Sequence, residues 1–146
     1  QLGNIKDLLK QAKYKIREYK LPIIPDDYFV ELKEAQVAIK NIVKELERKS
    51  INIETLNTRV DTARDLVFKV YNTTNEMIKT AMMAEKAIVY GNRYRSVKKA
   101  IYEGLNKAEV LFIKGKYKKS LELSIDTIDI IEPDIYKKLL NLYDNE

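Results

Sequence analysis

The sequence lacks cysteine, histidine and tryptophan, and it contains only 4 glycines and 3 prolines in 146 residues. Without cysteine or histidine there is no disulfide, no thiolate nucleophile, no Ser-His-Asp or Cys-His catalytic set and no zinc site of the usual kind. Few glycines and prolines favour helices, because these two residues weaken or interrupt them. No apolar run reaches about 18 residues, so the sequence predicts no membrane span.

What is present is a balanced mixture of 45% hydrophobic and 34% charged residues, with a net charge of +5. This composition is typical of a folded protein with a core, and the abundance of helix formers predicts an all-α chain. The positive charge falls short of a nucleic-acid-binding signature. No Gly-rich phosphate loop and no convergent acid–base set occurs, so we expect no enzyme and no cofactor.

One stretch, from Ile53 to Arg95, organises the rest. Its apolar or small residues alternate in steps of three and four, which is a heptad seam. A continuous helix of this length, about 40 residues, cannot bury its seam alone, so the other helices must supply its partners. The seam consists of Ile53, Leu56, Val60, Ala63, Val67, Val70, Thr74, Met77, Ala81, Ala84, Ile88 and Gly91.

Two helices are predicted before this stretch, from Asn4 to Lys20 and from Asp26 to about Lys49, each with apolar residues in steps of four and three. We expect Asn4, the aspartates Asp26 and Asp27, and Asn52 to act as N-caps of the three helices. Short connections favour antiparallel neighbours. Residues 1–75 therefore read as a spectrin-like three-helix domain.

Three shorter helices are predicted after it, at Val97–Lys114, Tyr117–Ile131 and from about Ile135 to Leu142, with Gly115 as a left-handed C-cap. They would cover the second half of the long helix and complete a C-terminal domain, residues 76–146. The predicted fold is an elongated antiparallel helical bundle: a spectrin-like repeat, one shared helix of about 40 residues and a C-terminal helical cap.

The end of the long helix is the candidate site. No acidic residue occurs between Glu85 and Glu103, while arginines and tyrosines alternate there. These two residue types are enriched at interface hot spots, since each offers a large, preorganised contact area. The predicted protein-binding residues are Tyr90, Gly91, Asn92, Arg93, Tyr94, Arg95 and Ser96.

A structural alternative stays open for these residues. Arg93 and Arg95 would be solvated or paired with carboxylates of the helix at Tyr117–Ile131, and the tyrosines would be core residues with hydroxyls at the rim. The site would then brace the bend after the long helix.

Two weaker patterns lie further along the chain. The spacing of small and aromatic residues from Ala108 to Leu121 resembles one tetratricopeptide unit, but stable arrays need about three units, so a simple helical hairpin is favoured. Four lysines, at 114, 116, 118 and 119, could touch acidic lipid or nucleic acid. Because Glu122 and nearby aspartates offset them, we interpret this segment as a solvated turn.

The residues also resemble a known family. The run from Ala84 and Glu85 through Ile88-Val89-Tyr90-Gly91-Asn92-Arg93-Tyr94-Arg95 is similar to the C-terminal part of EzrA, the septation ring formation regulator family of Gram-positive bacteria. So are Ala108-Glu109, Leu111-Phe112, Gly115, Tyr117, Ser120-Leu121 and Ile131-Glu132-Pro133. The resemblance implies that the segment around Asn92 and Arg93 corresponds to the family's functional patch, whose first position is glutamine; the residue aligned with that position here is Val89.

The resemblance implies a non-enzymatic scaffold of cell division that binds FtsZ, restrains ring assembly and links the ring to wall-synthesis proteins. It implies a location on the cytoplasmic side of the membrane at the septum. An N-terminal anchor outside this chain would provide the membrane attachment. The alternative is a purely structural spectrin-like spacer or a tetratricopeptide-like adaptor without an FtsZ role. Self-association is left open.

Overall fold

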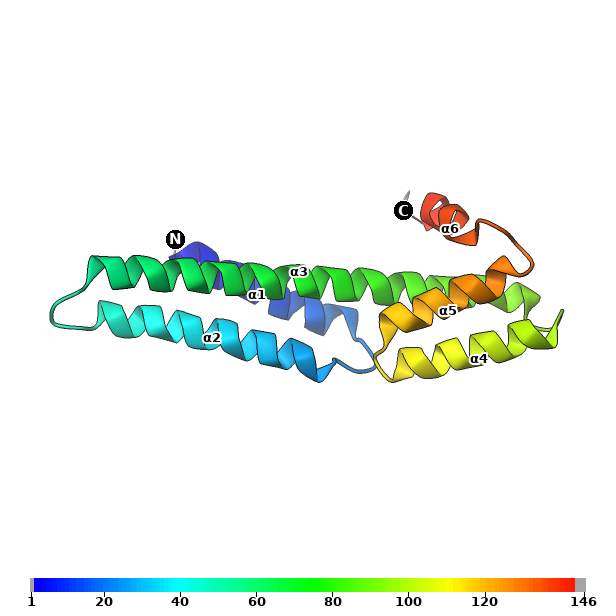
Figure 1. Ribbon diagram of the computed structural model, residues 1–146, viewed down its shortest axis with the longest axis horizontal. Helices are drawn as coiled ribbons and strands as arrows, with labels where there is room; N and C mark the ends of the chain where they lie inside the picture. The colour runs from blue at the N-terminus through cyan, green and yellow to red at the C-terminus, as the bar shows by residue number, and fades with distance from the viewer. Residues whose placement is uncertain (1, 144–146) are drawn as a thin grey trace. The chain divides into compact units, whose positions relative to one another are not determined.

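The computed structural model describes residues 2–143, and every regular element in that range is helical (Figure 1). The predicted all-α class is confirmed. None of these helices has the length and apolar character of a membrane span. The elements are α1 (Leu2–Tyr19), α2 (Asp26–Leu46), α3 (Ile53–Gly91), the short 3-10 helix η1 (Asn92–Tyr94), α4 (Lys99–Ile113), α5 (Tyr117–Asp129) and α6 (Ile135–Tyr143).

The chain forms two compact units that share α3. The first contains the described parts of Gln1–Lys20 and Ile24–Glu76. The second contains Leu21–Ile23 and the described part of Met77–Glu146. The prediction of two domains, a three-helix domain at 1–75 and a C-terminal domain at 76–146, stays a prediction.

The long helix is confirmed as a single element, since α3 has 39 residues and measures about 60 Å at 1.5 Å per residue. The side-chain oxygen of Asn52 accepts a hydrogen bond from the Thr55 N–H at 3.0 Å, so the predicted cap is present. The predicted end was wrong. The α-helix stops at Gly91 and continues as η1, rather than running to Arg95.

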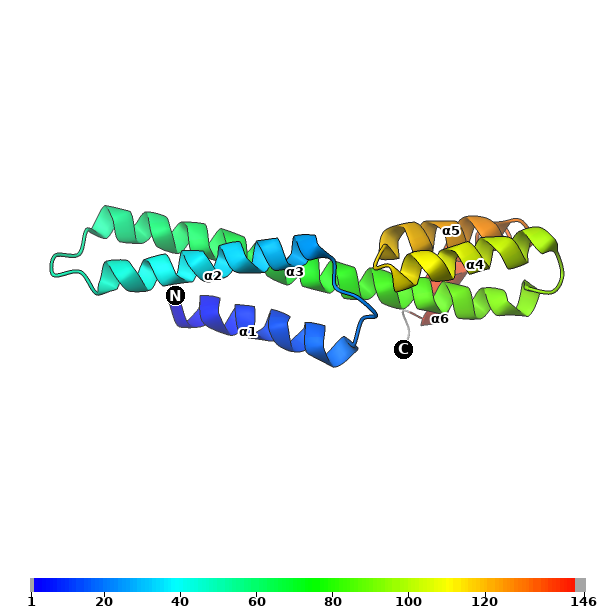
Figure 2. The same cartoon turned by 90° about the horizontal axis from the view of Figure 1, so that it is seen from below.

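The first unit is a three-helix arrangement of α1, α2 and the first part of α3, which lie side by side in Figures 1 and 2. The buried side of α1 consists of Ile5, Leu9, Ala12 and Ile16, which repeat in the predicted steps of four and three. Between α2 and α3, Ile42 and two alanines, Ala38 and Ala63, form a buried cluster. Small residues let the helices approach closely, and the aliphatic residues fill the seam.

Polar contacts secure the ends of this unit. Lys15 Nζ donates to Asn75 Oδ1 at 2.9 Å and lies 4.7 Å from the centre of the Tyr71 ring. Glu45, only 3% exposed, accepts the Asn52 N–H at 3.0 Å and so holds the turn between α2 and α3. A hydrogen bond from a backbone N–H to a carboxylate is among the stronger kinds in proteins.

Three predicted N-caps of the first two helices, Asn4, Asp26 and Asp27, were wrong. Helix α1 already includes Asn4, because it begins at Leu2. Asp26 and Asp27 lie inside the first turn of α2, where they favour the positive end of the helix dipole, but neither makes a capping hydrogen bond. Pro25 precedes the first helical residue instead.

In the second unit, α4 and α5 form an antiparallel hairpin. Gly115 has φ of 82°, the left-handed conformation predicted for a C-cap. The Lys116 N–H donates to the Leu111 carbonyl at 2.9 Å, and the Gly115 N–H to the Phe112 carbonyl at 3.0 Å. This pair of bonds is a Schellman motif, which fixes the turn. Helix α4 begins at Lys99 instead of Val97, and α5 ends at Asp129 instead of Ile131.

Close backbone approach lets α4 and α5 pack. A Cβ atom on Gly104 would lie 2.3 Å from Thr127 Oγ1. The Ser120 hydroxyl, fully buried, donates to the Ala108 carbonyl at 2.7 Å. These small residues produce the tetratricopeptide-like spacing of the sequence, and they serve a single hairpin.

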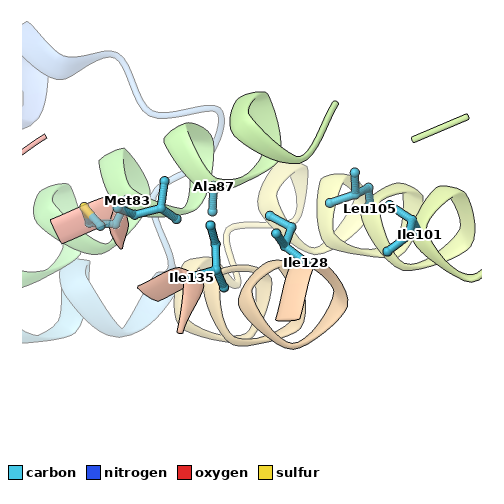
Figure 3. Close-up of a cluster of buried hydrophobic side chains, with 7 residues drawn as sticks. Met83, Ala87, Ile101, Leu105, Ile128 and Ile135 are labelled. Carbon is cyan, nitrogen blue, oxygen red and sulfur yellow. The ribbon is translucent and has the colours of Figure 1, made fainter. Parts of the chain in front are cut away.

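The core of the second unit draws on four helices. Met83 and Ala87 come from α3, and α4, α5 and α6 each add isoleucine or leucine side chains (Figure 3). All of these side chains are at most 7% exposed. The further members are Ile101, Leu105, Ile128, Ile135 and Leu139.

Candidate functional site

The candidate site begins where α3 ends, at Gly91, which lets α4 and α5 pack against α3. Gly91 is buried, and a Cβ atom there would lie 2.9 Å from Ile128 Cδ1 and 3.1 Å from Leu105 Cδ1. The missing side chain therefore lets α4 and α5 close on α3. After Gly91 the backbone tightens into η1, and the chain turns towards α4.

Tyr90 and Tyr94 lie one helical turn apart and converge on one carboxylate. The Tyr90 hydroxyl is 2.7 Å from both oxygens of Glu132, and the Tyr94 hydroxyl donates to Glu132 Oε2 at 2.8 Å. The two rings contact edge to face, with centroids 6.4 Å apart. Two phenol donors on one carboxylate fix the end of α3 and η1 against the segment that follows α5.

The ionisation of these groups follows from their contacts. Burial and the hydrogen bond to Glu132 raise the pKa of Tyr90 to about 12. The same carboxylate raises the pKa of Tyr94 through its hydrogen bond. Conversely, the hydrogen bond from Tyr90 is the largest cause of the lowered pKa of Glu132, ahead of the opposing effect of burial. At neutral pH both phenols are therefore donors, and Glu132 is an ionised acceptor.

Glu132 also connects α6 to this cluster. Its side chain is 17% exposed, and Lys138 Nζ lies 3.3 Å from its Oε1. One turn earlier, Asp129 Oδ1 accepts the Ile135 N–H at 3.2 Å and thereby holds the start of α6. The two carboxylates at the end of α5 thus have separate tasks: Asp129 caps the next helix, while Glu132 binds the tyrosines.

Arg93 is held by Tyr90 yet remains exposed. Its guanidinium carbon lies 3.7 Å from the centre of the Tyr90 ring, and its Nε donates to the Tyr90 carbonyl at 3.2 Å. A cation over an aromatic face is attracted by the electrons of the ring. The side chain is therefore preorganised without losing its contact with solvent. Asn92 and Ser96 are exposed beside it along the chain.

Arg95 behaves differently, because it is 25% exposed and forms an ion pair with Glu109 of α4. Its Nε atom is buried and has no hydrogen-bond partner among the described residues. The guanidinium thus turns towards its own bundle. Arg95 joins the turn after η1 to α4, as an internal structural contact.

The seven predicted residues therefore divide into two sets. Tyr90, Gly91, Tyr94 and Arg95 make contacts within the second unit, while Asn92, Arg93 and Ser96 are exposed. The contacts of the first set are those that the structural alternative expects, except that the carboxylate partner of Arg95 is on α4 and not on α5. Whether the exposed residues bind a protein stays a prediction.

Sequence reasoning missed Glu132, the centre of the cluster. It is 38 and 42 residues away from the two tyrosines, so no local pattern connects them. The sequence singled it out only as part of the Ile131-Glu132-Pro133 motif of the family resemblance, in the segment that follows the end of α5 at Asp129. The described residues contain no group of three or more acidic side chains suited to a metal ion.

Comparison with known proteins identifies the family of the chain. A family model described as "Septation ring formation regulator, EzrA" matches residues 1–143. The chain belongs to the EzrA family. The resemblance inferred from the motifs around Asn92 and Gly115 is therefore confirmed, and it extends over the upstream bundle as well.

Curated relatives agree with this assignment. The chain is 31% identical over all of its 146 residues to the septation ring formation regulator EzrA of Geobacillus sp. strain WCH70, where it covers 26% of that protein. EzrA of Lactococcus lactis strain IL1403 is 28% identical over 92% of the chain, which covers 24% of that relative. The chain spans about a quarter of the length of these relatives. No solved structure matches it.

Proposed function

We propose that this chain is the protein-binding end of a non-enzymatic division scaffold that restrains FtsZ ring assembly and links the ring to wall-synthesis proteins. Membership in a family of septation regulators supports a role in cell division. The finer role rests on one observation: Arg93 is exposed while the Tyr90 ring and carbonyl hold its guanidinium. Such a preorganised arginine loses little conformational entropy when it binds a carboxylate.

The partner would offer acidic and apolar groups together. Arg93 supplies the charge, and Asn92 can donate and accept hydrogen bonds beside it. Val89, one turn before Arg93, is 60% exposed and adds an apolar contact. We place this activity on the cytoplasmic side of the membrane at the septum, with an anchor elsewhere in the full-length protein.

Charge reversal of Arg93 tests this site. The Arg93→Glu variant should weaken binding to FtsZ at least tenfold, because the preorganised cation becomes a repelling anion. The matched control is Arg59→Glu, at an exposed arginine of α3 that has no ion pair with a described residue. Binding can be measured by co-sedimentation of the chain with FtsZ polymers and, separately, with wall-synthesis proteins.

The melting temperature distinguishes the structural alternative. Arg93→Glu should change it little, since the side chain is exposed, whereas a bracing role predicts a lower melting temperature with unchanged binding per folded molecule. If both arginine variants bind FtsZ and wall-synthesis proteins as the unmodified chain does, the chain is a spacer.

A further inference from the structure

Helix α4 is apolar on two sides. Its buried side packs into the core of the second unit through Ile101, Leu105 and Ala108. Its other side exposes Tyr102 to 52%, Val110 to 50% and Ile113 to 64%. Together with position 106 between them, the positions 102, 110 and 113 follow steps of four, four and three. Tyr102, Val110 and Ile113 therefore share one face of the helix.

Lysines surround this exposed apolar face. Lys107, Lys114 and Lys116 are all exposed, and none makes an ion pair or hydrogen bond with another described residue. No acidic residue occurs between Glu109 and Glu122 in the sequence. We call Tyr102, Lys107, Val110, Ile113, Lys114 and Lys116 the α4 outer face.

The two carboxylates of α4 do not cancel this charge. Lys99 Nζ lies 3.8 Å from Glu103 Oε1, one turn along the helix. Glu109 pairs with Arg95. Each carboxylate therefore has its own cation, and the three lysines of the outer face remain uncompensated. Glu122, expected from the sequence to offset Lys114 and Lys116, makes no ion pair with either of them in the described chain.

The end of this face is an ordered turn. The Schellman bonds at Gly115 fix the backbone between Lys114 and Lys116. The buried Tyr117 then exchanges hydrogen bonds with both backbone groups of Ile23. Ile23 is itself 47% exposed, so a further aliphatic side chain lies beside the turn.

We propose that the α4 outer face binds the surface of an anionic membrane. Aliphatic side chains can enter the boundary between headgroups and acyl chains, and tyrosine favours that depth. Lysine, a compact charge on a flexible stem, suits a diffuse layer of anionic headgroups. Protein interfaces, by contrast, are depleted in lysine. The contact is peripheral, and it does not depend on the function proposed above.

A single tryptophan can report this contact, since the sequence contains none. The 146-residue Ile113→Trp variant is mixed with vesicles of phosphatidylcholine alone or with phosphatidylglycerol added. Its emission should shift to the blue only with the anionic vesicles. Val37→Trp, at an exposed position of α2, is the matched control and should not shift.

The lysines are tested by neutralisation. The triple variant Lys107→Gln, Lys114→Gln, Lys116→Gln should bind anionic vesicles about 100-fold more weakly, given about a fivefold effect for each lysine near a charged membrane. The control removes the same charge from the first unit, at the exposed Lys6, Lys10 and Lys40. Co-sedimentation measures both, and circular dichroism verifies that both remain folded.

Three results would overturn the proposal. One is an absent shift of Ile113→Trp with anionic vesicles. Another is an equal loss of vesicle binding in both triple variants, which would mean that binding depends on the net charge of the chain and not on the α4 outer face. The third is a shift with polyglutamate but not with vesicles, which would assign the face to an acidic protein. Binding that is lost in 0.5 M salt would support the lysine contribution, because salt at that concentration screens surface charge over about 4–5 Å.

Discussion

The two units of this chain share one helix but achieve close packing differently. In the first unit, aliphatic residues and alanines at regular heptad positions form the seam, as in the cluster of Ala38, Ile42 and Ala63. In the second unit, glycines at Gly91 and Gly104 allow close approach, and the carboxylate of Glu132 joins three elements. Periodic seams tolerate exchange of similar side chains, whereas close backbone contacts and a carboxylate shared by two tyrosines depend on particular residues.

The largest difference is expected from adding one methyl group to a glycine. Gly104→Ala should destabilise the second unit by about 2–3 kcal/mol, because the new Cβ would lie 2.3 Å from Thr127 Oγ1 and 2.6 Å from Thr127 Cγ2. Hydrogen exchange measured on peptides from each unit should show faster exchange in the second unit.

Gly3→Ala is the matched control in the first unit, since a Cβ atom there has no neighbour within 4 Å. It should be neutral or stabilising, because alanine favours a helix over glycine. The double variant Gly104→Ala, Thr127→Ala should recover part of the loss. Equal losses from both glycine substitutions would contradict the comparison.

A smaller effect is expected from two hydrogen-bonded carboxylates, one in each unit. Glu132→Gln should cost the second unit about 1–2 kcal/mol, because both tyrosines lose a charged acceptor. The folded-state pKa of Glu132 is lowered, so its contribution is complete above the unfolded value near 4.3 and disappears as pH falls through the folded value. The melting temperature of this variant should therefore change less between pH 2 and 7 than that of the unmodified chain.

The corresponding variant of the first unit is Glu45→Gln. The backbone N–H of Asn52 is the main cause of the lowered pKa of Glu45, so this substitution should reduce acid sensitivity around the α2–α3 turn. Hydrogen exchange should change at the backbone amides of that turn and not at those of η1. If either glutamine variant altered exchange in the other unit equally, the two carboxylates would not act locally.

The smallest effect is a change in how stability depends on pH in alkali. The pKa of Tyr90 is raised to about 12, above the ordinary value near 10. Its stabilising contribution is therefore complete below pH 10 and disappears as pH rises towards 12. The Tyr90→Phe variant should lose stability at neutral pH but show a shallower decline between pH 10 and 12. The control is Tyr71→Phe in the first unit, because the hydrogen bond with Lys15 lowers the pKa of Tyr71 instead of raising it.

Much of the fold followed from local pattern. The seam from Ile53 to Gly91 predicted one long helix, and the stripe of α1 predicted its buried side. Asn52 and Gly115 were recognised because capping chemistry needs only a few neighbouring residues. Asn4 and Asp26 fit the same rules but were wrong, since a helix can extend past a good cap when its earlier residues also find helical contacts.

The candidate site was less predictable. The acid-free window selected the correct segment, but it grouped Arg93 and Arg95, which point to different surroundings. Their separation depends on Glu109 and Tyr90, and on the change from α-helix to η1 after Gly91. No spacing rule contains that information.

The sequence by itself determined the helices, the seam of α3 and the family, because each follows from periodicity, capping or motif within short segments. Only the tertiary structure decided which of the residues at the end of α3 are exposed. Gly91 is buried because α4 and α5 close on it, and Tyr90 and Tyr94 are occupied because Glu132 reaches them from about 40 residues away. Contacts over such distances depend on how the helices pack, which local residue patterns do not specify.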